Sequence, residues 1–328
     1  MKVIRTPLQF RRVPGPIFLA AGFFDGVHKG HQMVIAAALE RAREVGGQAW
    51  VLTFDRHPLS VIAPSKCPPL LCSLDERLRL LEQLGVDGVL VLEFTRRLAV
   101  KEPETFVKWL CGKPRAAGDG RSGSGASVKL SEVRCGHNWR FGRRAKGTPE
   151  LLARYGKFYG FRVVIVPYAE YKGIEISSTR IRYALREGRL KDAAGMLGRP
   201  YSIRDKVIGG RGVGKALCVA TANVRPSAEV LPPNGVYAVR VIHDGVGYNG
   251  VSNLGVRPTF PGANLEHNVL ETHLLGFAGD LYGQDIEVCF MARLRDERAF
   301  DSPQELARQI RQDIEDAQPH FKNQRANN

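Results

Sequence analysis

The feature that most constrains the fold is a short apolar run, Ile17–Ala21, which leads into the glycine-punctuated segment GFFDGVHKGH at residues 22–31. Apolar residues then recur at the spacing of an amphipathic helix. A helix that begins just after a strand offers unpaired amides and a partial positive charge to an anion. We therefore predict a phosphate site here, with His28 and His31 on one side of the first helical turn and Gly30 letting a phosphate approach the backbone.

The two histidines indicate how such a site would act. No good nucleophile lies in the segment, so His28 and His31 suit stabilisation of the charge that develops on a phosphoryl group. Preorganised donors of this kind contribute on the order of 10²–10³ in rate each. The alternatives are two surface histidines at a helix start, or a metal site, for which no third ligand is evident.

The first half of the chain alternates strand-like and helix-like segments. Strands are predicted at Ile17–Ala21, Gln48–Phe54, 89–92, 128–135 and 161–166, and helices at 30–45, 73–85, 103–110, from 149 and from 178. Ser73 and Glu76 form a capping box, and Thr148 with Pro149 forms a second helix start. The alternation predicts an α/β fold with a parallel sheet and helices on both faces. The strand at 128–135 is expected at an edge of the sheet.

From about residue 201 the pattern changes to short strands separated by turn residues. Residues 236–242 and 286–294 alternate like half-buried strands, and residues 301–302 cap a helix that runs to about residue 317. This predicts a small antiparallel barrel closed by a C-terminal helix. We place the domains at 1–186 and 187–320, followed by a polar tail at 321–328.

Composition narrows the partners and the compartment. The formal net charge of +15 favours an anionic partner: nucleic acid, an acidic membrane face or phosphorylated small molecules. No apolar stretch approaches the roughly 18 residues of a membrane span, so no membrane association is expected. Six scattered cysteines without metal-ligand spacing favour reduced thiols and a cytoplasmic protein. Residues 113–127, rich in Gly and Ser, are expected to form a flexible surface loop.

A second phosphate-binding segment is predicted at ISSTRIR, residues 176–182. Ser178 and Thr179 are capping residues by type. Arg180 and Arg182 follow them at the positive end of the helix dipole, where cations are disfavoured unless an anion is present. The segment therefore predicts guanidinium groups that clamp a polyphosphate.

These segments resemble the HxGH nucleotidyltransferase superfamily, and FDGVHKGHQ is similar to the bacterial bifunctional riboflavin kinase/FAD synthetase family. Three further stretches match that family in order: TFDRHP at 53–58, GHNWRFG at 136–142 and ISSTRIR at 176–182. The resemblance implies a Rossmann-like HxGH nucleotidyltransferase domain that transfers AMP from ATP, with Mg²⁺, to the phosphate of FMN, giving FAD and pyrophosphate. Where the family usually has a small or polar residue, often Asn, this chain has Phe23.

The resemblance also implies roles for single residues of this domain. His28 and His31 would hold the α and β phosphates of ATP as the transition state forms. The other ATP and phosphate contacts would come from Gly22, Phe24, Asp25, Gly30, Ser178, Thr179 and Arg182, and the flavin contacts from His57, Asn138 and Arg140.

The second half resembles the riboflavin kinase module, which implies a flavokinase β-barrel that phosphorylates riboflavin to FMN. GGRGVGKALCVATAN at 209–223, GVRPTF at 255–260 and ETHLL at 271–275 carry the resemblance. The implied site residues are Glu271 as the base, Thr221 and Asn223 as magnesium ligands, Gly212 and Gly214 at the ATP phosphates, and Arg257 at the flavin.

Two departures from the family pattern bear on the kinase activity: Cys218 and Ala220 stand where the family has Gly and Pro. The leading hypothesis is a two-step enzyme, monomeric or transiently oligomeric, that takes ATP, riboflavin and FMN. The first alternative is an FMN adenylyltransferase with an inactive barrel. The second is a basic nucleic-acid-binding protein, although the basic residues are dispersed and no nucleic acid is expected as a partner.

Overall fold

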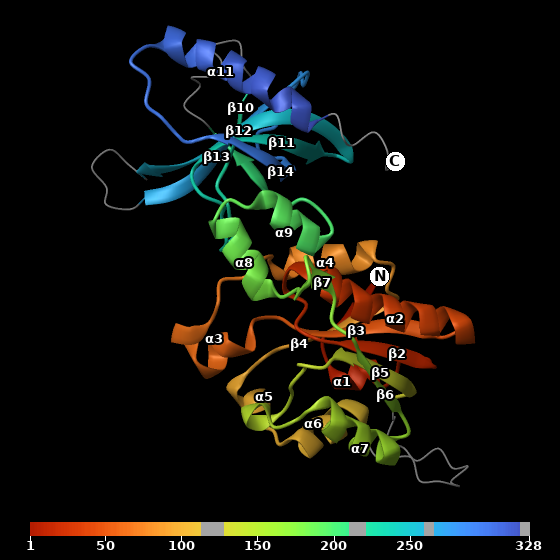
Figure 1. Cartoon of the computed structure of the whole chain (residues 1–328). Coiled ribbons are helices and arrows are strands. Elements are labelled where there is room, and N and C mark those ends of the chain that lie inside the picture. Colours follow the sequence, from red (N-terminus) through yellow and green to blue (C-terminus); the bar gives the residue numbers. More distant parts are fainter. Residues whose placement is uncertain (113–127, 210–220, 259–265, 322–328) are drawn as a thin grey trace. The chain divides into compact units, whose positions relative to one another are not determined.

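A computed structural model describes residues 1–112, 128–209, 221–258 and 266–321 of the chain (Figure 1). These residues form two compact units, Met1–Ser178 and Thr179–Asn328. The predicted loop at 113–127, the tail from residue 322, and the positions of Gly212, Gly214, Cys218 and Ala220 lie outside the described residues.

The first unit is built on a six-stranded sheet in the order β1-β4-β3-β2-β5-β6. Its strands are β1 (Lys2–Ile4), β2 (Ile17–Ala21), β3 (Gln48–Phe54), β4 (Gly88–Leu92), β5 (Leu130–Gly136) and β6 (Arg162–Val166). Every pairing between them is parallel, which confirms the predicted α/β architecture. Parallel strands end at one edge of the sheet, so the segments that follow β2, β3 and β5 lie along the same edge.

The prediction that residues 128–135 form an edge strand is wrong. β5 pairs with β2 on one side and with β6 on the other, so β6 is the edge strand. Glu132 is buried on this interior strand, and its carboxylate forms an ion pair of 2.5 Å with Arg134. A buried charge is tolerated in a sheet when an opposite charge compensates it.

Helices cover both faces of this sheet. The helices of the first unit are α1 (Pro7–Phe10), α2 (Lys29–Val45), α3 (Pro58–Ile62), α4 (Leu74–Gln83), α5 (Arg96–Ala99), α6 (Pro103–Cys111) and α7 (Pro149–Tyr159). Successive strand residues face opposite sides. Phe18 and Val51 therefore pack with α2 and α4 in one core cluster, while Leu19 and Leu52 pack with α6 in the other. A small hairpin, β7 (Glu170–Tyr171) and β8 (Ile174–Glu175), precedes the end of the unit.

The predicted helix starts are confirmed. The Ser73 hydroxyl accepts from the Glu76 amide at 3.2 Å, and Thr148 caps α7 in the same way with Pro149 as the first helical residue. The other half of the predicted capping box is wrong, because the Glu76 carboxylate forms an ion pair with Arg79 in place of a bond to the Ser73 amide. Helix α4 ends at Gln83, two residues before the predicted end.

The second unit contains α8 (Ser178–Arg186), which begins at the unit boundary, α9 (Leu190–Leu197) and a closed barrel in the order β10-β13-β12-β11-β14-β9. The strands are β9 (Ser202–Ile208), β10 (Thr221–Val224), β11 (Gly235–His243), β12 (Val246–Pro258), β13 (Glu266–Leu274) and β14 (Asp285–Arg295). All their pairings are antiparallel, which confirms the predicted barrel.

The predicted C-terminal helix is α11 (Pro303–Ala317), capped by the Ser302 hydroxyl. It packs on the outside of the barrel through Ala317 and Ile314. Arg295 on β14 also forms a bidentate ion pair with buried Asp313, and both nitrogen–oxygen distances are 2.7 Å. Among the described residues, no helix has both the length and the apolar composition needed to cross a membrane.

Candidate functional site

The loop between β2 and α2 has an unusual backbone. Phe24 and Val27 have φ values of 60° and 40°, and Gly26 has a φ of 76°. Side-chain-bearing residues rarely adopt this region, and where they do the strain is often held at a functional site. Gly22 is required because a Cβ there would lie 2.8 Å from the Phe24 ring, which is itself 1% exposed. The loop is therefore held in one shape by its own packing.

Three hydrogen bonds fix this loop from outside. The Asp25 carboxylate accepts from the Leu71 amide at 2.9 Å, and the Cys72 sulfur accepts from the Gly26 amide at 3.2 Å. The Ser178 hydroxyl donates to the carbonyl oxygen of Asp25 at 3.1 Å, although the two residues are 153 positions apart. The two segments for which the sequence predicted phosphate binding therefore meet in the fold.

The two histidines form one stacked pair. Their ring centroids are 3.5 Å apart and their planes are inclined by 18°. Nδ1 of His28 accepts from the His31 amide at 3.3 Å, which makes His28 the cap of α2. Because Nδ1 accepts, the proton of the neutral His28 ring is on Nε2. A Cβ on Gly30 would lie 3.2 Å from the His28 ring, so the glycine gives that ring its place over the helix start.

His31 occupies a site that disfavours its charged form. Burial, then the charge of His28 and then that of Arg77, lower the pKa of His31 well below its ordinary value. Its Nδ1 atom is buried and has no hydrogen-bond partner among the described residues. A bound anion would favour the protonated form of His31.

Sequence reasoning missed Arg77, which is the buried cation of this site. Arg77 lies on α4 and is 0% exposed. Its Nη1 donates to the carbonyl oxygens of Phe23 (2.9 Å) and Phe54 (3.0 Å) and to the Thr53 hydroxyl (3.1 Å). Nε and Nη2 are buried without a hydrogen-bond partner in the described part of the chain. A basic residue in an amphipathic helix is usually exposed, so the sequence carried no signal of this burial.

Phe23, the departure from the family pattern, lies between Arg77 and His57. The guanidinium carbon of Arg77 is 4.3 Å from the centroid of the Phe23 ring. On the other side, the His57 ring meets Phe23 edge to face, with centroids 4.9 Å apart. Nδ1 of His57 accepts from the Leu59 amide at 3.1 Å and caps α3. The aromatic ring thus forms a cation–π contact and a ring contact at the position of the family's polar residue.

The predicted flavin residues after β5 are accessible. Asn138 and Arg140 are both exposed, and they follow β5 at the edge of the sheet where the β2–α2 loop also lies. Arg140 donates to the carbonyl oxygens of His137 (3.2 Å) and Trp139 (2.8 Å). Trp139 and Phe141 stack with ring centroids 4.9 Å apart, and both rings pack in the core cluster on this side of the sheet, which anchors the turn.

The barrel brings three further predicted residues together. Asn223 on β10 lies directly opposite Glu271 on β13. Residues opposite each other in an antiparallel pair project from the same side, and Thr221, two residues earlier on β10, shares that side. A hydroxyl, an amide and a carboxylate therefore offer oxygen atoms of the kind that Mg²⁺ prefers. Among the described residues, no group of three or more His, Cys, Asp or Glu side chains could hold a metal ion.

Asn253 extends this row of polar residues, and sequence reasoning missed it. It lies opposite Glu271 on the other neighbouring strand, β12. Its amide nitrogen donates to Glu297 at 3.0 Å, and its oxygen is buried without a hydrogen-bond partner in the portion described. The sequence could have indicated that Asn253 lies opposite Glu271 only if the pairing of β12 with β13 had been known. The side chain of Arg257, the predicted flavin residue on β12, lies outside the described atoms.

Comparisons with known proteins agree with both halves of this arrangement. The family model described as FAD synthetase matches residues 11–118 and 123–180, and the one described as riboflavin kinase matches residues 197–321. The bifunctional riboflavin kinase/FMN adenylyltransferase of Escherichia coli K12 is 35% identical over 325 residues, covering 98% of each chain. The chain belongs to the bifunctional riboflavin kinase/FMN adenylyltransferase family.

Other members of this family are similarly distant. The protein of Pseudomonas fluorescens is 36% identical over 293 residues, covering 89% of each chain, and that of Bacillus subtilis is 33% identical, covering 94% of this chain and 93% of its own. A crystal structure from Streptococcus pneumoniae, described as a macrolide-efflux protein, aligns with a TM-score of 0.79 and 27% identity, covering 96% of this chain and 98% of its own. The two-domain fold is therefore shared along almost the whole chain.

Proposed function

We propose that this chain makes FAD from riboflavin in two ATP-dependent steps, phosphorylation to FMN in the barrel and adenylylation of FMN in the first unit. The observation that carries the proposal is the stacked pair of His28 and His31 on a strained, externally fixed loop. Burial, followed by the charges of His28 and Arg77, lowers the pKa of His31, and a polyphosphate would favour its charged form.

Adenylylation is an in-line displacement at phosphorus. A phosphate oxygen of FMN bonds to the α-phosphorus of ATP, the bond to the bridging oxygen breaks, and pyrophosphate leaves. Alignment and charge neutralisation govern such a step, and no covalent enzyme intermediate is required. Nε2–H of His28 and the ring of His31 would donate to the phosphoryl oxygens as their charge grows.

The other residues of the first site would bind and orient the substrates. Ser178, Thr179 and Arg182 are proposed to hold the β and γ phosphates. Gly22, Phe24, Asp25 and Gly30 are proposed to act through the loop backbone, because the Phe24 ring and the Asp25 carboxylate are buried. His57, Asn138 and Arg140 are proposed to contact the flavin or its phosphate.

Phosphorylation requires a base and a bound metal–nucleotide complex. We assign Glu271 as the group that accepts the proton of the ribityl 5′-hydroxyl while the oxygen attacks the γ-phosphorus. The bond from the γ-phosphorus to the β–γ bridging oxygen breaks, and ADP leaves. Thr221 and Asn223 would hold Mg²⁺, which neutralises the phosphates of ATP and orients them. Gly212 and Gly214 are proposed to lie over those phosphates and Arg257 to contact the flavin.

The boundary between the functional domains is proposed at residues 186 and 187, which keeps α8 whole. The FAD synthetase match ends at residue 180 and the riboflavin kinase match begins at residue 197, which supports a boundary in this interval. A cytoplasmic, monomeric or transiently oligomeric enzyme is proposed. Burial raises the pKa of the Cys111 and Cys135 thiols to about 12, which keeps them unreactive.

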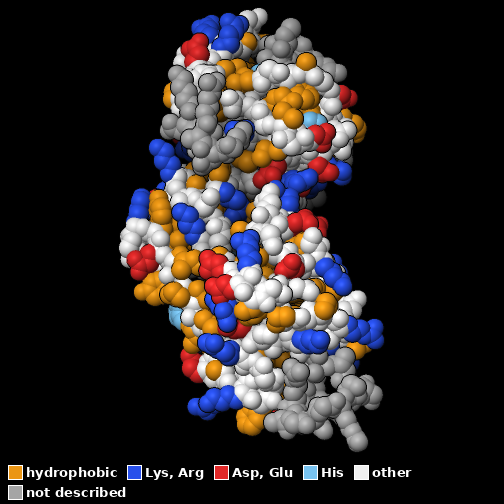
Figure 2. Space-filling view, turned by 90° about the vertical axis from the view of Figure 1, so that its right-hand side faces the viewer, with side chains coloured by type: hydrophobic (Ala, Val, Ile, Leu, Met, Phe, Trp, Pro, Cys, Tyr) orange, Lys and Arg blue, Asp and Glu red, His pale blue; other side chains and the backbone are white. Residues whose placement is uncertain are grey.

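The test is incubation of the pure protein with riboflavin, ATP and Mg²⁺, followed by chromatographic separation of the flavins. Both FMN and FAD should accumulate, and chelation of Mg²⁺ should stop both. FAD formed only from supplied FMN would mean that the barrel is inactive. Figure 2 shows Lys and Arg scattered among Asp and Glu on the face it presents, which does not favour nucleic-acid binding. Oligonucleotide titration at rising salt would test that alternative directly.

A further inference from the structure

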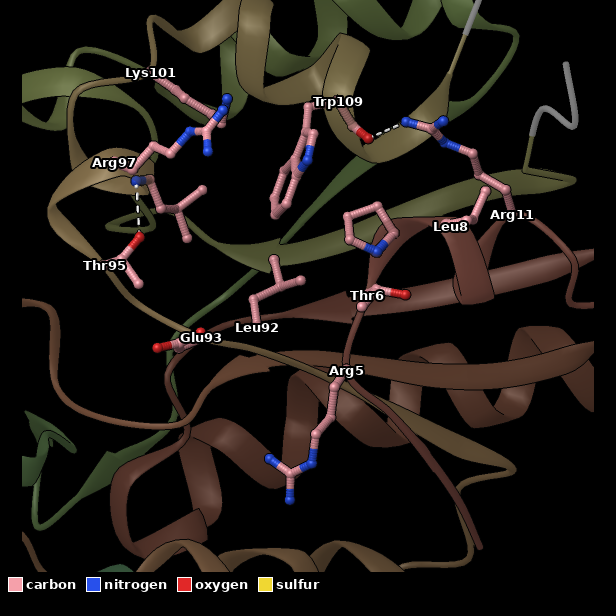
Figure 3. A pocket seen from close by; sticks show the side chains of 12 residues that line it. Arg5, Thr6, Leu8, Arg11, Leu92, Glu93, Thr95, Arg97, Lys101 and Trp109 are labelled. Atoms are coloured by element: carbon pink, nitrogen blue, oxygen red, sulfur yellow. Dashed lines mark hydrogen bonds between the residues drawn. The ribbon is translucent and has the colours of Figure 1, made fainter.

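A cavity of about 580 Å³ opens in the first unit at the β1 side of the sheet (Figure 3). Its walls come from the segment that leads into α1, the end of β4, α5 and α6. In the sheet order, β3 separates β4 from β2, which carries the histidine loop. None of the residues assigned to either reaction lines this cavity.

The cavity has an excess of positive charge. Arg5, Arg11, Arg97 and Lys101 line it together with one carboxylate, Glu93. Figure 3 shows the side chains of Arg97 and Lys101 extending beside each other. Arg11 donates to the backbone carbonyls of Trp109 and Leu110, so its charge is held in place at the end of α6. Cations gathered in a partly enclosed space attract an anion.

An indole forms the other distinctive wall. Trp109 is half-buried, and the ammonium group of Lys101 lies 5.6 Å from its ring centroid. Figure 3 shows the indole pointing toward Leu92, with Arg97 and Lys101 on one side and Arg11 on the other. Leu92 and Leu98 are buried and supply apolar surface beside it. A half-buried indole beside apolar side chains suits stacking of a planar ring.

We propose that this cavity is a second ligand site, which binds the phosphate ester of a planar heterocycle. The ring stacks on Trp109, and the phosphate binds Arg97 and Lys101, with bidentate contacts from the guanidinium. The volume lies within the range of small-molecule sites, about 300–1,000 Å³. Two compounds of the proposed reactions have this chemistry, a flavin mononucleotide and an adenine nucleotide. If either binds here, its concentration would affect the activity of the enzyme.

The test counts bound ligand in the absence of turnover. Radiolabelled FMN or AMP is dialysed to equilibrium against the full chain without Mg²⁺, at low and at high salt. The variants are Arg97→Gln combined with Lys101→Gln, and Trp109→Leu. Arg162→Gln is the matched control, because it removes an exposed cation from β6, outside the cavity.

The wild type should bind one equivalent more of FMN or of AMP than the double variant, and this equivalent should be lost at high salt. Trp109→Leu should weaken the same equivalent at least tenfold, and Arg162→Gln should leave it unchanged. Loss of FMN alone identifies the flavin ester as the ligand, and loss of AMP alone identifies the adenine nucleotide.

Equal stoichiometry in the wild type and the double variant would overturn the site. Loss of the equivalent in the double variant but full retention in Trp109→Leu would overturn the stacking of a ring. The double variant changes exposed or half-exposed side chains, and its rate of FMN adenylylation should stay within about twofold of wild type. That measurement separates failure of this site from failure of the proposed function, since the catalytic residues are untouched.

Discussion

The guanidinium of Arg77 lies over the ring of Phe23, with 4.3 Å between the guanidinium carbon and the ring centroid. The same guanidinium donates to the carbonyl oxygens of Phe23 and Phe54, which follow or end the neighbouring strands β2 and β3. One buried cation thus joins the ends of two strands on which the histidine loop and His57 depend. Arg77 is therefore a positioning residue in this structure, acting through the backbone and through Phe23.

Arg77→Met should lower the free energy of unfolding by about 2–4 kcal/mol, because it leaves buried carbonyl oxygens without a charged donor. It should also slow adenylylation at least tenfold, since the loop loses an anchor. Denaturant unfolding and flavin chromatography measure the two effects. Arg41→Met, which removes an exposed ion pair with Glu44 on α2, is the control and should cost less than about 1 kcal/mol. A wild-type rate in Arg77→Met would contradict the positioning role.

Variants of His28 can separate its capping role from its role in transfer. His28→Ala removes both the cap and the imidazole, so it should cost about 1 kcal/mol of stability and slow adenylylation on the order of 10²–10³-fold. His28→Asn keeps a capping acceptor and should recover the stability without the rate. Formation of FMN from riboflavin should be unchanged in both. If Asn restored adenylylation as well, the imidazole would have no catalytic role.

The lowered pKa of His31 predicts a dependence of stability on pH. The unfolded chain binds a proton on this residue near its ordinary value of 6.5, and the folded chain does so only at lower pH. The contribution of His31 to the free energy of unfolding is therefore fully present above pH 6.5. It is lost as the pH falls from 6.5 through the lower pKa of the folded state. His31→Asn should flatten the acid side of a plot of unfolding free energy against pH. An identical plot for wild type and variant would argue against a buried, neutral His31.

Glu271→Gln should abolish most FMN formation and leave adenylylation of supplied FMN intact, because the amide cannot accept the proton of the hydroxyl. A loss of 10²–10⁴-fold is expected for a general base. Asp285→Asn, which alters an exposed carboxylate on β14, is the matched control. Normal FMN formation in Glu271→Gln would remove this residue from the mechanism.

Asp313→Ala should destabilise the barrel, because it leaves the guanidinium of Arg295 without its buried partner. Breaking such a pair costs about 3–5 kcal/mol when both groups are buried, and the partial exposure of Arg295 favours the lower end. Denaturant unfolding should show the loss, while Asp316→Ala, on the exposed side of the same helix, should have little effect. Equal stability of the two variants would show that the ion pair does not anchor α11.

Local patterns predicted much of the fold. Strands β2 and β3 begin and end at the predicted residues, and the caps Ser73, Thr148 and Ser302 all begin helices. These signals are readable because side-chain period and capping depend on residues close together in sequence. The short elements β1, α1, α3 and α5 were not predicted, because a segment of so few residues shows no clear hydrophobic period.

Local sequence patterns predicted only part of the candidate site. The glycine-punctuated loop and its histidines follow from neighbouring residues, and the family resemblance follows from ordered motifs. The burial of Arg77 and the position of Asn253 opposite Glu271 do not, because both depend on which strands and helices become neighbours. The interior position of β5 escaped prediction for the same reason.

By itself, the sequence determined the type of most of the longer elements and the order of the two domains, since capping and side-chain period are local and the domain order follows from the order of such segments along the chain. The tertiary structure alone decided that the Ser178 hydroxyl meets the Asp25 carbonyl, that Asn223 faces Glu271, and that four cations share a cavity with Trp109. Such contacts join residues far apart in the chain. Their formation depends on chain topology and strand register, which no local pattern encodes.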